Sequence, residues 1–193
     1  MRYDKVDNFY RLQDVLSVDQ FYTLYDEFNS QYNTWKFTKN DGGLDHPPMG
    51  CIKKPSSIRS RVSTIGDNLT LIKFGSILKY QCEKILRCPL KLKRVNTNIQ
   101  FFGQESSFHT DGDESIWTLN IFACPYWKTE WGGEFILTTK PNQYYYETYI
   151  PNNGILFPAH LDHMGYAPNA LCKVPRLTVA YTYKELTSPS TVV

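Results

Sequence analysis

Two histidines, an aspartate and an arginine in the second half of the chain have the residue types of a redox metal site. They are His109, Asp111, His163 and Arg176. Two imidazoles and one carboxylate can occupy one face of an octahedral Fe(II) ion, which leaves three positions open for a chelating co-substrate and for O2. Side chains two residues apart on an extended strand point to the same side, so His109 and Asp111 can both reach one metal near a strand end.

The third ligand of such a site must come from another part of the fold. Two histidines could supply it, His160 and His163, and both follow the segment Phe157-Pro158-Ala159. The residues alone leave this choice open. A histidine and an aspartate in an H-x-D pair can also be an ordinary surface polar pair, so the pair predicts a metal site only together with its surroundings.

Arg176 opens a segment with the alternation of a strand, Arg176-Leu177-Thr178-Val179. Arg176 and Thr178 then share a face, opposite to the face of Leu177 and Val179. A guanidinium on an inward face is expensive to bury without an anion, and a bidentate carboxylate removes that cost. The anion is either a bound carboxylate or a carboxylate of the protein itself.

The composition fits one domain, residues 1–193, with a sizeable core. The chain has 193 residues, 41% of them hydrophobic, and 15% are aromatic, which favours a sheet-rich core. The net charge of +2 indicates neither a nucleic acid nor a membrane as partner. A basic run, Lys84–Arg94, is read as a solvated helix end and strand edge, with a nucleic-acid patch as the less favoured alternative.

The cysteines and the first residues indicate a cellular setting. The five cysteines are odd in number and include no C-x-x-C pair, which favours reduced thiols over disulfides or a structural zinc site. The first residues lack the apolar stretch of a signal peptide, and no run approaches the ~20 apolar residues of a membrane span. We therefore expect a soluble cytoplasmic protein.

The first part of the chain, about residues 1–89, is expected to provide helical support. A capping box begins at Ser17, and the apolar residues that follow predict an amphipathic helix of about three turns. A second helix is predicted from about Asn68 to Leu86, ended by Cys88-Pro89. Between them, Tyr32 to Ser63 is expected to be irregular, either a lid over a substrate or a surface excursion.

The remainder, about residues 90–186, is expected to form a β core. Short segments with turn signals between them predict a barrel or jelly roll, with the two helices covering one face. These predicted strands are 90–102, 116–123, 134–139, 144–150, 154–157 and 176–184.

From about Asn96 to Tyr183 the chain resembles the prolyl 4-hydroxylase group of Fe(II)/2-oxoglutarate-dependent dioxygenases. Five ordered elements carry the resemblance, and their order and spacing are more specific than any one of them. They are Phe101-x-Gly103-Gln104 before His109-x-Asp111, Thr118 with the stretch Phe122–Trp127, Trp131-Gly132-Gly133-Glu134-Phe135, Pro151-x-x-Gly154-x-x-x-Phe157 through His163, and Arg176-x-Thr178.

The resemblance implies a mainly β fold with flanking helices, built on a double-stranded β-helix of the jelly-roll or cupin type. It implies iron held by His109, Asp111 and His163, and it favours His163 over His160. It also implies that 2-oxoglutarate chelates the iron and places its far carboxylate on Arg176. The implied enzyme couples oxidative decarboxylation of 2-oxoglutarate by O2 to hydroxylation of a C–H bond, with ascorbate as reductant.

The chain departs from the family where the far carboxylate would bind. Phe122 stands where the family has a tyrosine, and Phe101 likewise lacks a hydroxyl group. We expect Asn120 and Thr178 to replace the missing hydrogen bond. Thr118, which precedes Phe122 on the same face, is a further candidate at the co-substrate.

The substrate that the resemblance favours is peptidyl proline. Trp117 and Trp131 are candidates for lining a peptide groove, although core packing explains aromatic residues more often. A free amino acid or other small metabolite is the alternative. A relative that only binds a partner is disfavoured by the retained ligands and arginine, and for nucleic-acid oxidation the basic run is the sole indication. The sequence does not indicate an oligomeric state.

Overall fold

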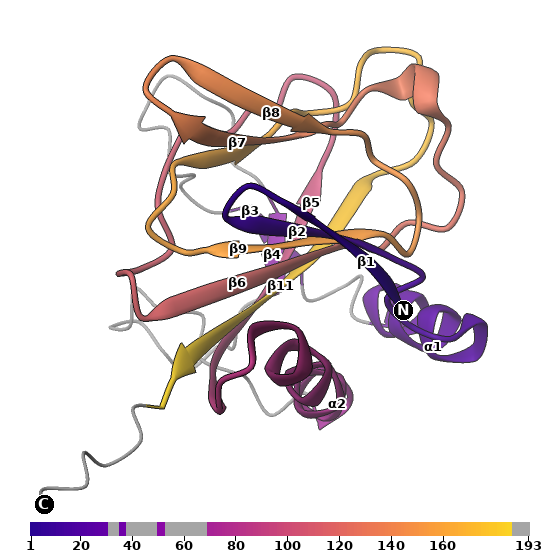
Figure 1. Ribbon diagram of the computed structural model, residues 1–193. Helices are drawn as coiled ribbons and strands as arrows, with labels where there is room; N and C mark the ends of the chain where they lie inside the picture. Colours follow the sequence, from indigo (N-terminus) through magenta and orange to yellow (C-terminus); the bar gives the residue numbers. More distant parts are fainter. Residues whose placement is uncertain (31–34, 38–49, 53–68, 187–193) are drawn as a thin grey trace, which may run out of the picture.

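The computed structural model describes residues 1–30, 35–37, 50–52 and 69–186, with the backbone alone in 35–37 and 50–52. Two helices and a short 3-10 turn accompany eleven strands in this part of the chain (Figure 1). In chain order the elements are β1 (Arg2–Val6), β2 (Phe9–Gln13), α1 (Val18–Ser30), β3 (Trp35–Phe37), β4 (Gly50–Ile52), α2 (Leu69–Leu86), β5 (Leu90–Gln100), β6 (Ile116–Phe122), η2 (Thr129–Trp131), β7 (Phe135–Lys140), β8 (Gln143–Glu147), β9 (Gly154–Pro158), β10 (His163–Gly165) and β11 (Arg176–Glu185).

The strands form two antiparallel sheets that face each other. The large sheet has the order β1-β2-β9-β6-β11-β5-β4-β3, and the small sheet has the order β10-β7-β8. An isolated bridge between His109 and His163 adds one more extended segment to the small sheet. Aromatic contacts join the two inner faces: the ring of Phe157 on β9 lies 5.3 Å from that of Phe135 on β7 and 4.6 Å from that of His163. The result is the jelly-roll core that the sequence predicted.

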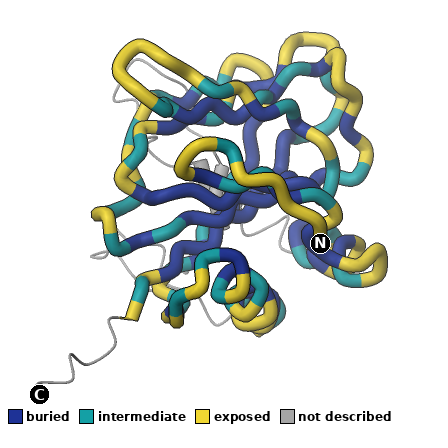
Figure 2. The backbone as a smooth tube through the Cα atoms, viewed as in Figure 1, coloured by how far each residue is buried: buried dark blue, intermediate teal, exposed yellow. Residues whose placement is uncertain are grey.

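The strands in the middle of the large sheet are buried on both faces, which is plain in Figure 2. One face is turned towards the small sheet, and the other is covered by α2. The close fit to α2 depends on Gly75, because a Cβ at that position would lie 2.7 Å from Leu92 Cδ2 and 3.0 Å from Tyr181 Cδ1. Tyr183 adds a buried hydrogen bond from its hydroxyl group to the Gly75 carbonyl, 2.9 Å long.

Both predicted helices are present, the first with its predicted capping box and the second with its predicted end. Ser17 Oγ accepts from Gln20 N at 3.3 Å, and Gln20 Oε1 accepts from Ser17 N at 3.1 Å, which is the reciprocal capping box. Helix α1 then buries Phe21, Leu24 and Phe28. Helix α2 begins one residue after the predicted position and ends at Leu86, as predicted.

Two features of the fold differ from the expectation. The segment before α1 contains the hairpin β1–β2, whose second strand pairs with β9, so the first 89 residues are not purely helical support. Within the stretch expected to be irregular, β3 and β4 form a hairpin on β5. The rest of that stretch, and the tail from 187 onward, lie outside the described residues. Among the described residues, no helix combines the length and the apolar character that a membrane span requires.

Candidate metal centre

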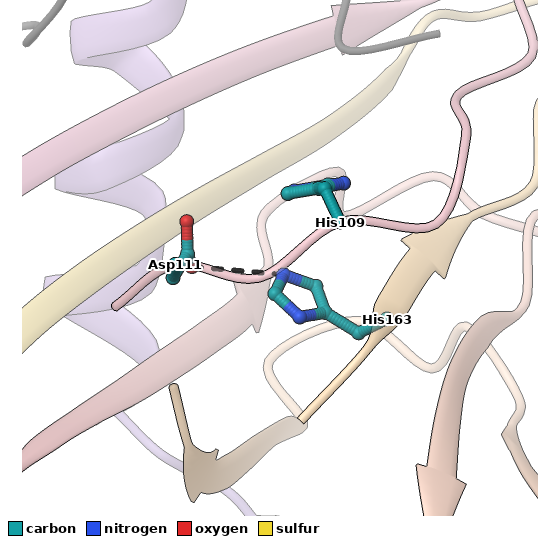
Figure 3. A group of neighbouring side chains, drawn as sticks. All are labelled: His109, Asp111 and His163. Atoms are coloured by element: carbon teal, nitrogen blue, oxygen red, sulfur yellow. Dashed lines mark ion pairs between the residues drawn. The ribbon is translucent and has the colours of Figure 1, made fainter. Parts of the chain in front are cut away.

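His109 and His163 lie opposite each other on neighbouring extended segments. Each backbone N–H donates to the carbonyl of the other residue, at 3.1 Å from His109 N and 3.0 Å from His163 N. Paired residues of an antiparallel bridge point to the same face, so the two imidazoles lie side by side, with ring centroids 4.4 Å apart (Figure 3). His160 lies in the turn before β10 and is exposed.

The second ring nitrogen of each histidine decides which atom is free for a metal. His109 Nδ1 lies 3.0 Å from the Ser107 carbonyl oxygen, and His163 Nδ1 lies 2.9 Å from the Leu161 carbonyl oxygen. Because a carbonyl can only accept, both Nδ1 atoms must carry the proton. The Nε2 atoms are then lone-pair donors, as metal ligation requires.

Asp111 is brought to the histidines by its backbone and by two side chains. Its N–H donates to the Ala159 carbonyl at 2.8 Å, which ties the loop after His109 to the end of β9. Thr118 on β6 donates its hydroxyl hydrogen to Asp111 Oδ2 at 3.0 Å, and Arg94 on β5 donates to Oδ1. One candidate ligand atom from each of His109, Asp111 and His163 lies within 4.8 Å of the others.

The charges of the site suit a divalent cation. Burial lowers the pKa of His163 to about 4, so its imidazole is neutral near pH 7. Burial alone would raise the pKa of Asp111, but electrostatic interactions with His163, Arg94 and His109 and the hydrogen bond from Thr118 outweigh it and lower that pKa. Asp111 Oδ2 lies 3.6 Å from His163 Nε2 (dashed in Figure 3). A neutral imidazole beside a carboxylate is the protonation state that a bound metal needs.

Arg176 is almost fully buried where β11 begins, and its guanidinium is only partly used by the protein. Nε donates to the Gly133 carbonyl at 2.9 Å, and Nη1 donates to Gln100 Oε1 at 2.7 Å. Nη2 is buried and has no hydrogen-bond partner among the described residues. Burial lowers the pKa of Arg176 to about 10, so the side chain stays charged near pH 7. An unused donor on a buried cation marks a place for an anion.

Two glycines allow the backbone to approach this arginine side chain closely. A Cβ on Gly165, two residues after His163, would lie 3.0 Å from both Nη1 and Nη2 of Arg176. A Cβ on Gly133 would lie 2.7 Å from Trp127 and 3.3 Å from Arg176 Cδ. The Tyr149 ring packs 5.3 Å from the guanidinium carbon, with its hydroxyl group bonded to the backbone at Leu177 and Cys124. Tyr149 therefore positions Arg176 and has no hydroxyl hydrogen left for a ligand.

The residues predicted at the co-substrate fall into two groups. Thr178 is paired with Phe122, and Asn120 follows one step along the same face of β6, so both are on the face that carries Arg176. Thr118 lies at the other end of that face, beside the metal ligands, where its hydroxyl group is bonded to Asp111. Phe122 is fully buried against Tyr149, with ring centroids 4.7 Å apart.

The two tryptophans named as substrate candidates are accounted for by other contacts. Trp117 lies on the face of β6 opposite to Thr118, where it packs on Tyr10 and donates to Glu185 Oε1 at 2.7 Å. Trp131 is buried edge-on against Trp127, with ring centroids 5.6 Å apart. Neither residue therefore enters the site proposed below.

Arg94 is the residue of the site that the sequence pattern assigned elsewhere. The pattern places it in the solvated basic run, but its side chain is only 20% exposed and is paired with Asp111. A signal was available: Arg94, Asn96, Asn98 and Gln100 alternate with Val95, Thr97 and Ile99, which makes one face of β5 polar. Gln100, which holds Arg176, belongs to the same polar face.

Among the comparisons with known proteins, the one with solved structures identifies the fold. No protein-family model matches the sequence, and no curated protein does either. Among solved structures, a prolyl 4-hydroxylase of Pseudomonas putida is 10% identical with a TM-score of 0.67, over 94% of this chain and 95% of that one. A prolyl hydroxylase of Trichoplax adhaerens, in complex with a hypoxia inducible factor peptide, is 12% identical with a TM-score of 0.70, over 93% and 84%.

A third structure widens the range of activities found on this fold. SnoN, a non-heme alpha-ketoglutarate-dependent epimerase from nogalamycin biosynthesis, is 13% identical with a TM-score of 0.71, over 97% of this chain and 81% of that one. The chain thus has the fold of the 2-oxoglutarate–Fe(II) oxygenases. At these identities the likeness concerns the fold, and the function must be argued from the site.

Proposed function

We propose that the protein is an Fe(II)- and 2-oxoglutarate-dependent oxygenase. The observation that carries this proposal is the pairing of two sites between the facing sheets: a triad of His109, Asp111 and His163, and a buried Arg176 with a donor that no described residue uses. The first suits a divalent metal with open positions, and the second suits a carboxylate. A 2-oxo dicarboxylic acid is the kind of ligand that needs both.

The three ligand side chains fit iron in their chemistry and in their support. Both histidines offer Nε2 because their Nδ1 hydrogens are held by backbone carbonyls. Asp111 is held by Thr118 and Arg94, which fix the direction of its carboxylate. Outer hydrogen bonds of this kind orient metal ligands and strengthen binding. His109, Asp111 and His163 would therefore hold the ion without rearranging their backbone.

Arg176 would hold the far carboxylate of 2-oxoglutarate through Nη2, and Gly165 lets the guanidinium take this position because it has no Cβ. Phe122 offers no hydroxyl group here. Thr178 and Asn120 lie on the same face of the sheet and would be the neighbours of that carboxylate. We assign to them the hydrogen bonds that a tyrosine would otherwise give. When bound, the iron and the oxo acid would supply the oxidative decarboxylation that activates O2 for attack on a C–H bond.

The residues of the chain would orient these groups and keep water away. The inner face is closed behind the site by Phe157 and Phe135, which pack on His163. Excluding water from the site protects a reactive oxidant from side reactions. Arg176 and the triad would fix the oxo acid so that the remaining open position of the metal faces the substrate.

Peptidyl proline is one candidate substrate, because two of the similar structures are prolyl hydroxylases. A small molecule is the other, because SnoN has been solved with alpha-ketoglutarate and a nogalamycin compound on the same fold. Both kinds of substrate are compatible with the architecture. The charges beside the metal bear on the choice between them.

The proposed function is tested by succinate release. Purified protein is incubated with Fe(II), ascorbate, O2 and 2-oxoglutarate, and succinate is measured with and without Fe(II). We expect iron-dependent succinate formation that the Asp111→Ala variant loses. Product mass after incubation with proline-rich peptides, free amino acids and oligonucleotides then identifies the substrate by the gain of one oxygen. A wild-type protein that binds neither Fe(II) nor 2-oxoglutarate would refute the proposal.

A further inference from the structure

A second guanidinium lies beside the candidate metal ligands, and the proposed function does not use it. Arg94 on β5 is four-fifths buried, and within the described part of the chain it donates one hydrogen bond, from Nη2 to Asp111 Oδ1. An arginine carries five N–H donors, so this single bond leaves most of its capacity free. Its Nε is buried and has no hydrogen-bond partner in the part of the chain that the structure describes.

Thr182 lies next to Arg94 and has an unused hydroxyl group. In the large sheet Thr182 on β11 is paired with Arg94 on one side and with Thr118 on the other, so the three side chains share one face. Thr182 therefore lies between the two residues whose side chains donate to the Asp111 carboxylate. Thr182 is only 3% exposed, and its Oγ1 has no hydrogen-bond partner among the described residues.

The other side chains on this inner face of the large sheet are also mostly polar. Asn96 and Asn98 continue the row from Arg94 towards Gln100 along β5, and Ala180 leaves room between Asn96 and Asn120. A buried polar atom without a partner is costly, and native sites retain one mainly where a ligand or water completes it. The inner face therefore has two such places, at Arg176 and at the pair Arg94–Thr182.

The charges near the metal favour an anion at the second place. With a divalent ion in the triad, the ion's two positive charges and that of Arg94 face two negative charges, from Asp111 and from the chelating carboxylate of the oxo acid. One positive charge remains, whereas at the other end Arg176 is balanced by the far carboxylate. An uncompensated charge in a largely buried site is unfavourable, and an anionic group of the substrate would neutralise it.

We propose that Arg94 and Thr182 form an anion-binding position for the substrate, and that the substrate is a small carboxylic acid such as a free amino acid. This inference rests on the proposed function, because the surplus charge exists only with metal and oxo acid in place. The carboxylate would accept hydrogen bonds from the Arg94 guanidinium and from Thr182 Oγ1. An internal residue of a peptide has no backbone carboxylate, so peptidyl proline would leave this position unfilled.

The inference is tested by equilibrium binding to the protein loaded with Fe(II) and 2-oxoglutarate under anaerobic conditions. The probes are the free L-amino acids, the carboxamide of each, and a peptide with an internal proline. The charge-transfer absorption of the iron–oxo acid chelate is recorded first, and calorimetry then measures each probe. We expect at least one acid to bind on the order of tenfold or more tighter than its amide, because a charge-assisted hydrogen bond is lost in the amide.

Three variants test which side chains cause the preference for the acid over its amide. Thr182→Val should weaken binding of the free acid by about tenfold, and Arg94→Gln should weaken it by on the order of 10–100-fold. Neither substitution should change the binding of the amide much. Lys91→Gln is the matched control, because it removes one positive charge from an exposed position of the same strand. It should leave the preference intact.

The outcomes separate the two proposals. If the chelate absorption does not form in the wild-type protein, the proposed function fails. If it forms but no acid is preferred to its amide, or the peptide binds and the acids do not, the inference alone fails. The inference also fails if Arg94→Gln weakens iron binding and leaves the preference for the acid unchanged, since Arg94 would then serve Asp111 only.

Discussion

Each candidate ligand histidine is fixed through Nδ1, the ring nitrogen that the proposed metal would not use. The Ser107 and Leu161 carbonyl oxygens accept from the Nδ1 atoms of His109 and His163, each two residues upstream in sequence. The local chain therefore sets both the ring orientation and the tautomer. His160 has no comparable position, because it is exposed in the turn before β10.

This difference predicts unequal effects of two alanine substitutions. His163→Ala should abolish iron-dependent turnover and lower Fe(II) affinity by at least about 100-fold, more than the loss of an outer partner of a ligand costs. His160→Ala should leave the Fe(II) affinity near that of the wild type. Calorimetric titration with Fe(II) under anaerobic conditions measures both, and the reverse order would mean that His160 is the ligand.

Arg176→Ala should weaken 2-oxoglutarate binding by about 10–100-fold, because a charge-assisted hydrogen bond to a carboxylate is lost. The control is pyruvate, a 2-oxo acid without the far carboxylate, which should bind wild type and variant equally. Fluorescence or calorimetric titration of the iron-loaded proteins gives both constants. An unchanged 2-oxoglutarate constant would remove Arg176 from the co-substrate site.

Buried His163 also predicts how the stability of the metal-free protein depends on pH. Its pKa of about 4 lies below the ordinary value of 6.5, so the unfolded chain takes up the proton first as the pH falls. The contribution of His163 to the free energy of unfolding is constant above pH 6.5 and is lost as the pH falls towards 4. At pH 5 it should lower the free energy of unfolding by about 2 kcal/mol relative to pH 7.

Urea unfolding at pH 7 and pH 5 measures this difference. His163→Gln cannot titrate in this range, so the variant should lose most of the drop in stability between the two pH values. An equal drop in variant and wild type would show that other groups cause it.

At the scale of elements, two glycines allow two close contacts, one between α2 and the large sheet and one between β10 and Arg176. Gly75 lets α2 pack on Leu92 and Tyr181, whereas Gly165 on β10 lets the Arg176 guanidinium pack against the backbone. Both substitutions to alanine introduce one methyl group at a tight contact. Their consequences should differ because one contact is structural and the other lies at the proposed carboxylate position.

Gly75→Ala should destabilise the fold by about 1–3 kcal/mol through overpacking and leave 2-oxoglutarate affinity unchanged. Gly165→Ala should displace the Arg176 guanidinium and weaken 2-oxoglutarate binding by about tenfold or more, with a smaller effect on the free energy of unfolding. Urea unfolding and anaerobic titration of the two variants form a matched pair. Equal 2-oxoglutarate affinities would contradict the role given to Gly165.

Sequence patterns predicted the elements that have strong local signals. The capping box at Ser17 and the Pro89 stop marked the helices, and turn residues separated β5 to β9 and β11 close to their observed ends. The hairpin β1–β2 was not predicted, because Arg2–Val6 is mostly exposed and carries no apolar alternation. Strand β10 has three residues and owes its existence to pairing with β7 and His109, which are distant in sequence.

The site was predicted less evenly than the fold. Residue types and spacing were enough to nominate His109, Asp111, His163 and Arg176, which the structure places between the two facing sheets. The roles of Arg94 and Gln100 depend on which face of β5 is turned inward, and that is fixed only by pairing with β11. Whether these side chains bind metal, oxo acid and substrate remains a prediction.

At the scale of the whole molecule, one buried core joins the N-terminal hairpin, both helices and both sheets. A polar link adds to it: Arg11 on β2 donates from Nε to the buried Glu147 on β8 at 2.8 Å, and Tyr145 donates to the same carboxylate. The two sheets are therefore held together at an edge away from the metal ligands. A ligand bound between them should stabilise the entire fold.

Metal loading is the direct test of this coupling. Fe(II) at about 100 times its dissociation constant should stabilise the folded state by about 2.7 kcal/mol, which corresponds to a rise of about 5–10 °C in unfolding temperature. Removing the metal with a chelator should reverse the shift. The His163→Ala variant should show little change, and an equal shift in that variant would place the ion elsewhere.

The reciprocal backbone bond between His109 and His163 has a consequence for which ion the protein carries. Because the bridge holds both imidazoles in place without a metal, the donor set is ready for any divalent ion of suitable size. Affinities of such nitrogen and oxygen donors rise from Mn(II) through Fe(II) and Co(II) to Cu(II), with Zn(II) also tighter than Fe(II). For the proposed iron-dependent activity, selection for iron must then come from cellular supply, and preparations exposed to zinc or copper should be inactive until they are stripped and reconstituted.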